Sequence, residues 1–249
     1  MRYFLTLAYN GQSYCGWQRQ PNAVSVQETL EHALAILLRV PIIVTGCGRT
    51  DTGVHAKQYM AHFDVASELP DRFLNSLNSL LPKSIAVFQV KQMHDTAHAR
   101  FDAYERSYEY HLSFRKDPFG DGLVWFFPQA HQMDLGKLQE VADLLPKYED
   151  FFPFCKTHSG VEHYRCQLRM AQWEWKEDTQ QLIFHVSANR FLRGMVRLLV
   201  GACVQTATGK LRVEQVQEAL ERQQSLPKSW SVPPDGLYLT AIRYPYPVN

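Results

Sequence analysis

The chain has 249 residues, of which 45% are hydrophobic and 20% charged, and its formal net charge is +1. This length holds one large domain or two of ordinary size, and the composition is that of a soluble globular protein. The near-neutral charge argues against a uniformly basic nucleic-acid binder. The sequence shows no secretory signal and no apolar run long enough to cross a bilayer, so we expect a cytoplasmic protein that does not enter a membrane.

The first half predicts four strands and two helices in the order βαββαβ, the ferredoxin-like or split βαβ arrangement. The first helix opens with a capping box, in which Ser25 is followed three residues later by Glu28. The second helix opens at Pro70 and is stopped by Pro82. Alternating or continuous apolar residues place the strands at 3–9, 42–44, about 58–65 and 85–90.

The second half repeats this element order. It contains a strand at 104–114, a helix capped by Asp134, a hairpin of strands near 172–176 and 182–186, a helix capped by Asn189 from Arg190 to about Ala207, a short helix near 213–220 and a strand at 236–243. We therefore expect an α/β (α+β) fold of two ferredoxin-like, RRM-like halves, 1–103 and 104–249. Their antiparallel sheets would lie side by side, with a central active-site cleft at the seam.

A glycine-rich segment, Gly46-Cys47-Gly48-Arg49-Thr50-Asp51-Thr52-Gly53-Val54-His55-Ala56, follows the expected strand at 42–44. In extended backbone, Arg49 and Asp51 project to the same side, and the arginine charge favours the ionised carboxylate. The glycines allow a ligand or another backbone segment to approach closely. This pattern suits an aspartate used as base or nucleophile beside a bulky substrate. A structural ion pair or an Asx-turn is the alternative.

A basic segment lies in the second half, where no acidic residue occurs between Asp178 and Glu214. On the expected helix, Arg190, Arg193 and Arg197 fall at i, i+3 and i+7 and form one stripe. Like charges at this spacing cost a helix a few tenths of a kcal/mol per pair, and a bound polyanion would offset that cost. The alternative is a solvated arginine face.

The loop at 10–21 holds two large aromatic residues, Tyr14 and Trp17. Such rings suit stacking on a nucleobase, but they could equally form a hydrophobic lid. Arg19 lies in the same loop, and we assign it with Trp17 to substrate binding.

The five cysteines form no CxxC pair, which favours reduced thiols, and we interpret Cys47 as a packing residue. The pairs Cys155 with His158 and His163 with Cys166 invite a zinc interpretation. The loop between them is shorter than in usual zinc modules, so we expect no metal. The loops GxxxxGK[ST] and GxGxxG are absent, so nucleotide cofactors are unsupported.

Motifs along nearly the whole chain resemble the TruA family of tRNA pseudouridine synthases. They are Tyr9-Asn10-Gly11, Gly16-Trp17-Gln18, Val26-Gln27, residues 48–56, Ala99-Arg100-Phe101, Arg106-Ser107-Tyr108-Glu109-Tyr110, Asp150-Phe151, residues 191–197 with Gly201, and Gly236-Leu237. The resemblance departs from the family pattern at Asn10, Thr52, Tyr148 and Glu149, none of which replaces a catalytic group.

By this resemblance Asp51 is the essential catalytic aspartate and Arg49 its ion-pair partner. Tyr108 would stack on the target base, and Arg197 would help to hold Asp51. The resemblance also implies a homodimer that binds the anticodon stem-loop of tRNA without cofactor or metal, and we add Arg190 and Arg193 as contacts to the RNA.

Two rival functions remain. A non-catalytic RNA-binding protein on the same fold would not need a buried carboxylate facing a polyanion. A hydrolase that cleaves a glycosidic bond with Asp51 normally needs a second carboxylate, and none is evident near the motif.

Overall fold

The computed structural model describes residues 1–156 and 160–248, which form two compact units. Unit 1 contains Met1–Arg106 and the C-terminal segment from Tyr238 onward, and unit 2 contains Ser107–Leu237. The halves expected from the sequence, 1–103 and 104–249, instead group the C-terminal segment with the second half. That each half is a domain in its own right stays a prediction. No helix in the described part of the chain is long and apolar enough to cross a membrane.

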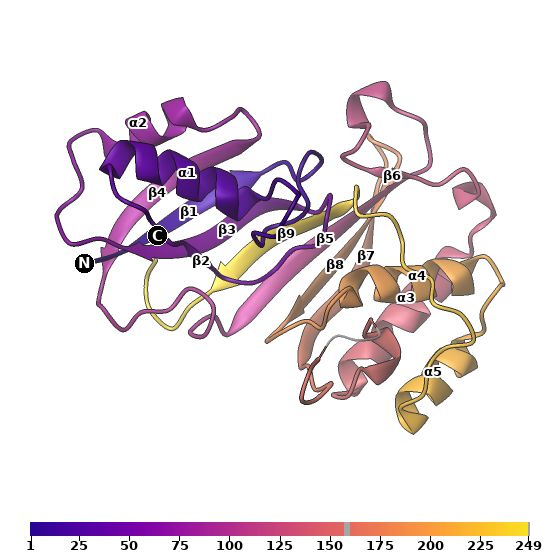
Figure 1. The fold of residues 1–249 in the computed structure, drawn as a ribbon. Coiled ribbons are helices and arrows are strands. Elements are labelled where there is room, and N and C mark those ends of the chain that lie inside the picture. Colours follow the sequence, from indigo (N-terminus) through magenta and orange to yellow (C-terminus); the bar gives the residue numbers. More distant parts are fainter. Residues whose placement is uncertain (157–159, 249) are drawn as a thin grey trace. The chain divides into compact units, whose positions relative to one another are not determined.

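Unit 1 has a sheet with helices against it (Figure 1). The strand order is β4-β1-β3-β9, with the short β2 beside β3. Strand β1 is antiparallel to both β3 and β4, whereas β9 is parallel to β3. The elements are β1 (Arg2–Tyr9), α1 (Val26–Leu38), β2 (Thr45–Gly46), β3 (His55–Asp64), α2 (Phe73–Leu80), β4 (Ile85–Met93) and β9 (Leu237–Arg243).

The core of unit 1 lies between this sheet and α1 and α2. The Ser25 hydroxyl caps α1 by accepting the Glu28 backbone N–H, as the capping box predicts. Leu30 and Leu34 of α1 are fully buried, as are Leu5 and Leu7 of β1. Burial of side chains this size contributes about 1.5–3 kcal/mol each, so the apolar face of α1 fixes the helix to the sheet.

The strand predicted at 42–44 is wrong. This segment has no strand, and only Thr45–Gly46 pairs with β3. The backbone N–H of Val44 instead donates to the Glu31 carboxylate at 3.0 Å, and its carbonyl accepts from the Gln27 amide at 3.0 Å. Because these side chains of α1 occupy the backbone groups of Val44, the segment is tied to the helix rather than to the sheet. The side chain of Ile43 is 81% exposed.

The described residues of unit 2 form an antiparallel hairpin and three α-helices, besides shorter elements. The strand order is β5-β8-β7, β7 and β8 are antiparallel, and β6 pairs in parallel with β5. Helix α3 packs against α4, α5 and β7. The elements are β5 (Glu105–Ser113), β6 (Trp125–Phe126), α3 (Leu135–Leu144), β7 (Leu168–Lys176), β8 (Gln181–Ala188), α4 (Met195–Ala207) and α5 (Val213–Arg222). Short 3-10 helices lie at Pro118–Gly120, Ala130–Gln132, Leu145–Lys147 and Phe152–Phe154.

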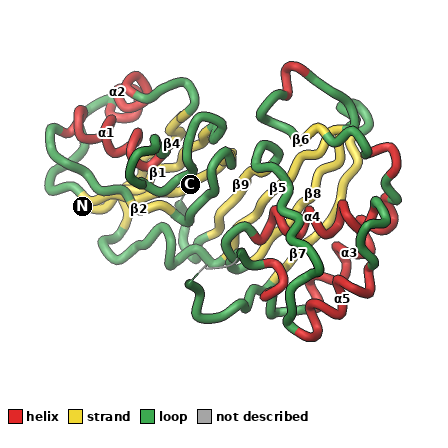
Figure 2. Tube along the Cα trace, turned by 45° about the vertical axis from the view of Figure 1, so that its right-hand side comes forward, coloured by secondary structure: helices red, strands yellow, loops and turns green. Residues whose placement is uncertain are grey.

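The connection from β5 to α3 is mostly loop, as Figure 2 shows by its green colour. It ends at Asp134, whose carboxylate accepts the backbone N–H groups of Gly136 and Lys137 and so caps α3. The sequence predicts this cap correctly.

The predicted start of the arginine-bearing helix is wrong. Helix α4 begins at Met195, not at Arg190, and its N-cap is Gly194 with a φ of 70°. The Asn189 side chain accepts the backbone N–H groups of Gln167 and Arg190, both at 2.8 Å. The segment before α4 is therefore held by hydrogen bonds outside any helix, including one to Gln167, and does not extend α4.

The repeated element order is confirmed in part. Unit 1 has β4-β1-β3 with β2 beside β3, which is the order of a split βαβ motif. Unit 2 has the corresponding elements β5, α3, β7, β8 and α4 in the same succession. The protein is therefore a mixed α/β fold, while two complete side-by-side halves around a cleft remain a prediction.

Candidate active site

The loop that carries Asp51 joins β2 to β3 in unit 1 and lies against the loop after β1. The Trp17 backbone N–H donates to the Thr50 carbonyl at 3.3 Å, and the Gly53 N–H donates to the Tyr14 carbonyl at 3.2 Å. Within the loop, the Val54 N–H donates to the Asp51 carbonyl at 3.2 Å. Backbone hydrogen bonds thus hold the chain on both sides of Asp51.

Two glycines let the loops approach this closely. A Cβ added to Gly16 would lie 2.3 Å from the Thr50 carbonyl oxygen, and Gly16 has a φ of +82°, a conformation that side chains rarely adopt. A Cβ added to Gly11 would lie 2.0 Å from the Val54 carbonyl oxygen. The glycines of the first loop therefore support the loop that carries the aspartate.

Aromatic side chains pack against this loop. The Tyr9 hydroxyl and the Thr50 hydroxyl are 2.8 Å apart, and the Tyr59 hydroxyl donates to the Gly48 carbonyl. The Trp17 ring stacks on Tyr59 with centroids 4.0 Å apart and is 2% exposed. Tyr14 is also buried. Of the two alternatives left open for these aromatics, the structure favours packing, because a buried ring has no face to offer a nucleobase.

Arg106 supports the same loop from another side, a role that sequence reasoning missed. Its guanidinium donates to the carbonyls of Cys47, Ala103 and Arg100 at 3.0, 2.8 and 2.8 Å. The sequence did contain an indication of this role. Arg106 lies among the aromatic residues of the expected strand at 104–114, and an arginine in such surroundings needs a polar partner. Burial raises the pKa of the Cys47 thiol to about 11, which agrees with its interpretation as a packing residue.

Asp51 is half-buried at the surface of this braced loop, and Arg49 is exposed. Their ion pair and their catalytic roles stay predictions. Arg19 is 3.7 Å from Glu28 and 3.6 Å from Glu31, so its charge is already close to two carboxylates of α1. An arginine held in this way is less suited to phosphate binding than an unpaired one.

In unit 2, Tyr108 extends from β5 and meets Phe191 edge to face. The ring centroids are 5.1 Å apart and the planes are inclined by 86°. Contacts of this geometry contribute about 0.5–1.5 kcal/mol and restrict the ring orientation. The contact with Phe191 thus restricts the orientation of the half-buried Tyr108 ring.

Arg197 lies in the first turn of α4 and is anchored to the segment after α5. Its Nε donates to the Val232 carbonyl at 2.7 Å, and the Val232 N–H donates to the Arg197 carbonyl at 3.3 Å. The side chain is half-buried. Because both the backbone and the side chain of Arg197 bind Val232, the direction of the guanidinium is fixed within unit 2.

Arg190 and Arg193 precede α4, so the stripe of three arginines on one helix, predicted from their spacing, is wrong. The Arg190 guanidinium lies 3.2 Å from the His163 Nε2, and the Arg193 carbonyl accepts the Lys156 N–H at 3.2 Å. The Arg193 side chain is exposed. The two arginines remain candidates for RNA contact, but from a loop.

The described residues contain no group of three or more His, Cys, Asp or Glu side chains that could hold a metal ion. Of the four residues considered for zinc, His158 lies outside the described residues. The absence of a metal requirement stays a prediction.

Comparison of the chain with known proteins identifies its class. A family model described as tRNA pseudouridine synthase matches residues 148–245. Relatives along nearly the whole chain are the tRNA pseudouridine synthases A of Porphyromonas gingivalis (41% identical, covering 98% of this chain and 97% of the relative), Parabacteroides distasonis (41%, 98% and 96%) and Nitrosomonas eutropha (34%, 98% and 88%).

The chain belongs to the tRNA pseudouridine synthase A family, the TruA family. The resemblance stated from the motifs is therefore confirmed. A solved protein of unknown function from Galdieria sulphuraria is 12% identical, covers 88% of this chain and 93% of its own, and has a TM-score of 0.25. So distant a likeness carries no argument about the fold.

Proposed function

We propose that this tRNA pseudouridine synthase, an isomerase, converts uridine to pseudouridine in the anticodon stem-loop of tRNA. The observation that carries the proposal is the braced loop that presents Asp51, in a chain whose full-length relatives bear this activity in their names. The proposal includes a homodimer working in the cytoplasm without a cofactor.

The reaction breaks the bond between uracil N1 and the ribose, turns the base, and rejoins it to the ribose through carbon 5. Asp51, when ionised, either attacks the sugar as a nucleophile or removes a ribose proton to give a glycal. In both routes the base stays in the site and no water is consumed. A carboxylate fixed by backbone hydrogen bonds at its flanks suits either route, because a small error in its position would slow the reaction.

The target uridine must leave the helical stack before reaction. We assign Tyr108 to stack on the unstacked base, since its ring extends from a regular strand and is oriented by Phe191. We assign Arg49 and Arg197 to the carboxylate of Asp51. Arg190 and Arg193 would contact phosphates of the RNA, with Arg19 and Trp17 as the weakest of the proposed contacts, given their ion pairs and burial.

The experiment is release of tritium from tRNA labelled at uridine carbon 5. The native protein should release tritium without free uracil, and Asp51→Asn should lower the rate by at least about a thousandfold, as expected when a nucleophile or base is removed. Asp71→Asn is the matched control, because Asp71 is an exposed aspartate of the same unit.

The outcomes separate the rival functions. If neither native protein nor control releases tritium although both bind tRNA, the protein is an RNA-binding protein without this catalysis. Release of free uracil by the native protein would instead identify a glycosidic hydrolase.

A further inference from the structure

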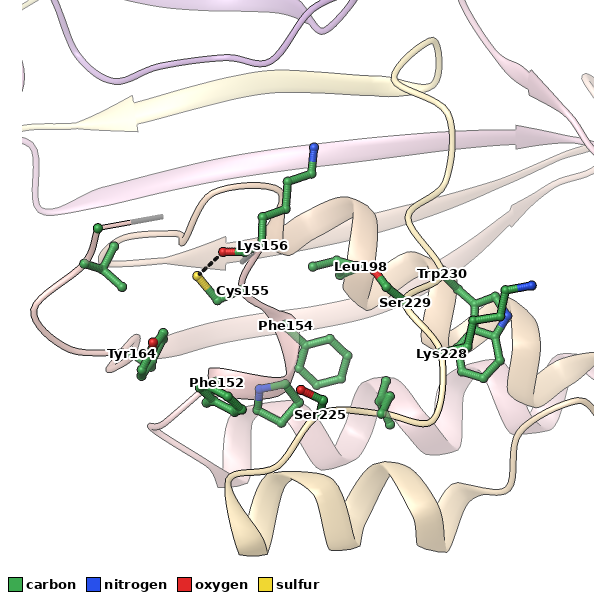
Figure 3. A pocket seen from close by; sticks show the side chains of 14 residues that line it. Phe152, Phe154, Cys155, Lys156, Tyr164, Leu198, Ser225, Lys228, Ser229 and Trp230 are labelled. Atoms are coloured by element: carbon green, nitrogen blue, oxygen red, sulfur yellow. Dashed lines mark hydrogen bonds between the residues drawn. The ribbon is translucent and has the colours of Figure 1, made fainter. Parts of the chain in front are cut away.

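Unit 2 contains a cavity of about 420 Å³ that none of the proposed catalytic side chains lines. Residues from 152–156, 160–164 and 225–230 form it, together with Leu198 of α4 (Figure 3). Ligand sites in proteins begin at about 300 Å³, so this cavity is large enough for a nucleotide.

The lining combines aromatic rings, hydroxyls and cations. Phe154 is fully buried at the base of the cavity, and Figure 3 shows its ring between these segments. Phe152 and Tyr164 meet edge to face with centroids 5.0 Å apart and form one wall. Trp230 and Leu198 contribute to the opposite side. A flat, uncharged ring system such as a nucleobase fits between such surfaces.

The charge of the lining selects an anion. Lys156 and Lys228 both line the cavity, on different sides of it in Figure 3, and none of the lining residues that the structure describes is acidic. Hydroxyl groups of Ser225, Ser229 and Tyr164 add hydrogen-bond donors. Aromatic rings for a base together with lysines for phosphate are the combination that proteins use for single-stranded nucleic acid.

One lining segment of the cavity continues to a residue that binds Arg197 of the proposed site. A Cβ added to Gly201 of α4 would lie 1.6 Å from the Trp230 carbonyl oxygen, so the segment that carries Trp230 lies directly on the helix. Two residues further on, Val232 exchanges two hydrogen bonds with Arg197. A ligand that settles against Trp230 would therefore stabilise the segment that orients Arg197.

We propose that this cavity receives an unstacked nucleotide of the RNA substrate other than the uridine that is isomerised. Its base would lie against the half-buried rings of Phe152 and Trp230, and its phosphates would lie near Lys156 and Lys228. The inference rests on the proposed function, because it takes RNA as the substrate. It adds a second nucleotide-binding site, which would help to select the RNA.

Two variants test the cavity. Ser225→Trp fills it with a ring, and Lys228→Gln removes one cation; both side chains are exposed, so both proteins should unfold at the native temperature. We expect KM for tRNA to rise roughly tenfold in Ser225→Trp and roughly threefold in Lys228→Gln, with kcat within about twofold. Lys137→Gln, an exposed lysine of α3 that does not line the cavity, is the control and should keep the native KM.

A cross-linking measurement reports on the cavity without relying on catalysis. Transcribed tRNA that carries 4-thiouridine, bound to Asp51→Asn protein and irradiated, should cross-link to peptides containing Phe152 or Trp230, and Ser225→Trp should abolish these cross-links. Native KM in both cavity variants together with absence of these cross-links would overturn the proposal. If the native protein forms no pseudouridine but these cross-links occur, the proposed function fails while the nucleotide site stands.

Discussion

In unit 1 the proposed catalytic aspartate lies in a loop, whereas in unit 2 the side chains proposed to act with it, Tyr108 and Arg197, extend from β5 and α4. The loop has no regular β-sheet hydrogen bonds to hold it. Backbone hydrogen bonds from the neighbouring loop and side-chain hydrogen bonds with Arg106, Tyr9 and Tyr59 hold it instead. A strand and a helix need fewer such supports, because their own hydrogen bonds fix the direction of each side chain.

This difference predicts unequal sensitivity to mutation. Around Asp51, many contacts are between backbone atoms of two loops. A methyl group added at Gly11 or Gly16 would force these loops apart. Around Tyr108 and Arg197, a change in a supporting side chain leaves the strand or helix intact. Substitutions at the supports of the Asp51 loop should thus affect folding, whereas substitutions at the supports of Tyr108 and Arg197 should affect mainly the rate.

The largest expected effect is that of Gly16→Ala. The new Cβ would meet the Thr50 carbonyl oxygen at 2.3 Å, and alanine at a φ of +82° is strained. We expect a loss of about 2–4 kcal/mol in the free energy of unfolding, measured by urea denaturation. Gly48→Ala, in the loop that carries Asp51, is the control, because a Cβ there has no neighbour within 4 Å and the residue has no positive φ. Equal stability of the two variants would show that the contact between the loops is not a support.

Much of this fold could be predicted from the sequence, since the order of strands and helices follows from hydrophobic periodicity and caps such as Ser25 and Asp134. At both wrong segments, 42–44 and 190–194, the local pattern omits hydrogen bonds that decide the backbone conformation. At 42–44 the side chains of Glu31 and Gln27, distant in sequence, bond to the backbone of Val44. At 190–194 the neighbouring Asn189 side chain accepts the Arg190 N–H, and the Arg193 carbonyl accepts the Lys156 N–H. A local pattern carries no information about such partners.

The candidate site divides in the same way. Asp51, Arg49, Tyr108 and Arg197 could be named because they occur in short motifs that resemble a family. The supports around them could not, because the roles of Gly11, Gly16 and Arg106 depend on which loop lies against which. Trp17 illustrates the limit: an aromatic residue in a loop predicts exposure about as well as burial, and only its contact with Tyr59 decides.

A second prediction concerns the loss of stability at low pH, which should affect unit 1 before unit 2. His62 of β3 accepts the Ala99 N–H through Nδ1 at 3.1 Å. Burial lowers its pKa from 6.5 to about 4, with further lowering by Arg2 and His98, against opposing effects of Asp64 and Asp102. The unfolded chain thus binds a proton below pH 6.5 that the folded chain refuses until about pH 4. The contribution of His62 to stability should be constant above about pH 6.5 and fall by about 2–3 kcal/mol as the pH drops to 4.

The measurement is urea denaturation between pH 4 and 7.5, combined with hydrogen exchange resolved by peptide. Peptides of unit 1 should lose protection first as the pH falls. His62→Gln keeps an acceptor for the Ala99 N–H and should remove this part of the pH dependence, whereas His131→Gln, an exposed histidine of unit 2, should not. An unchanged pH profile in His62→Gln would assign the acid sensitivity to other groups.

The smallest expected effect is that of Phe191→Leu in unit 2. Leucine fills much of the same half-buried space but lacks the ring edge that meets Tyr108 at 86°. The free energy of unfolding should change by less than about 1 kcal/mol, and kcat for pseudouridine formation should fall roughly two- to fivefold because Tyr108 spends less time in the stacking orientation. Phe119→Leu, at a ring that is 92% exposed, should leave both quantities unchanged. If Phe191→Leu lowers stability by several kcal/mol with kcat unchanged, unit 2 depends on packing at its functional side chains as strongly as unit 1 does, and the contrast between a braced loop and self-supporting elements is lost.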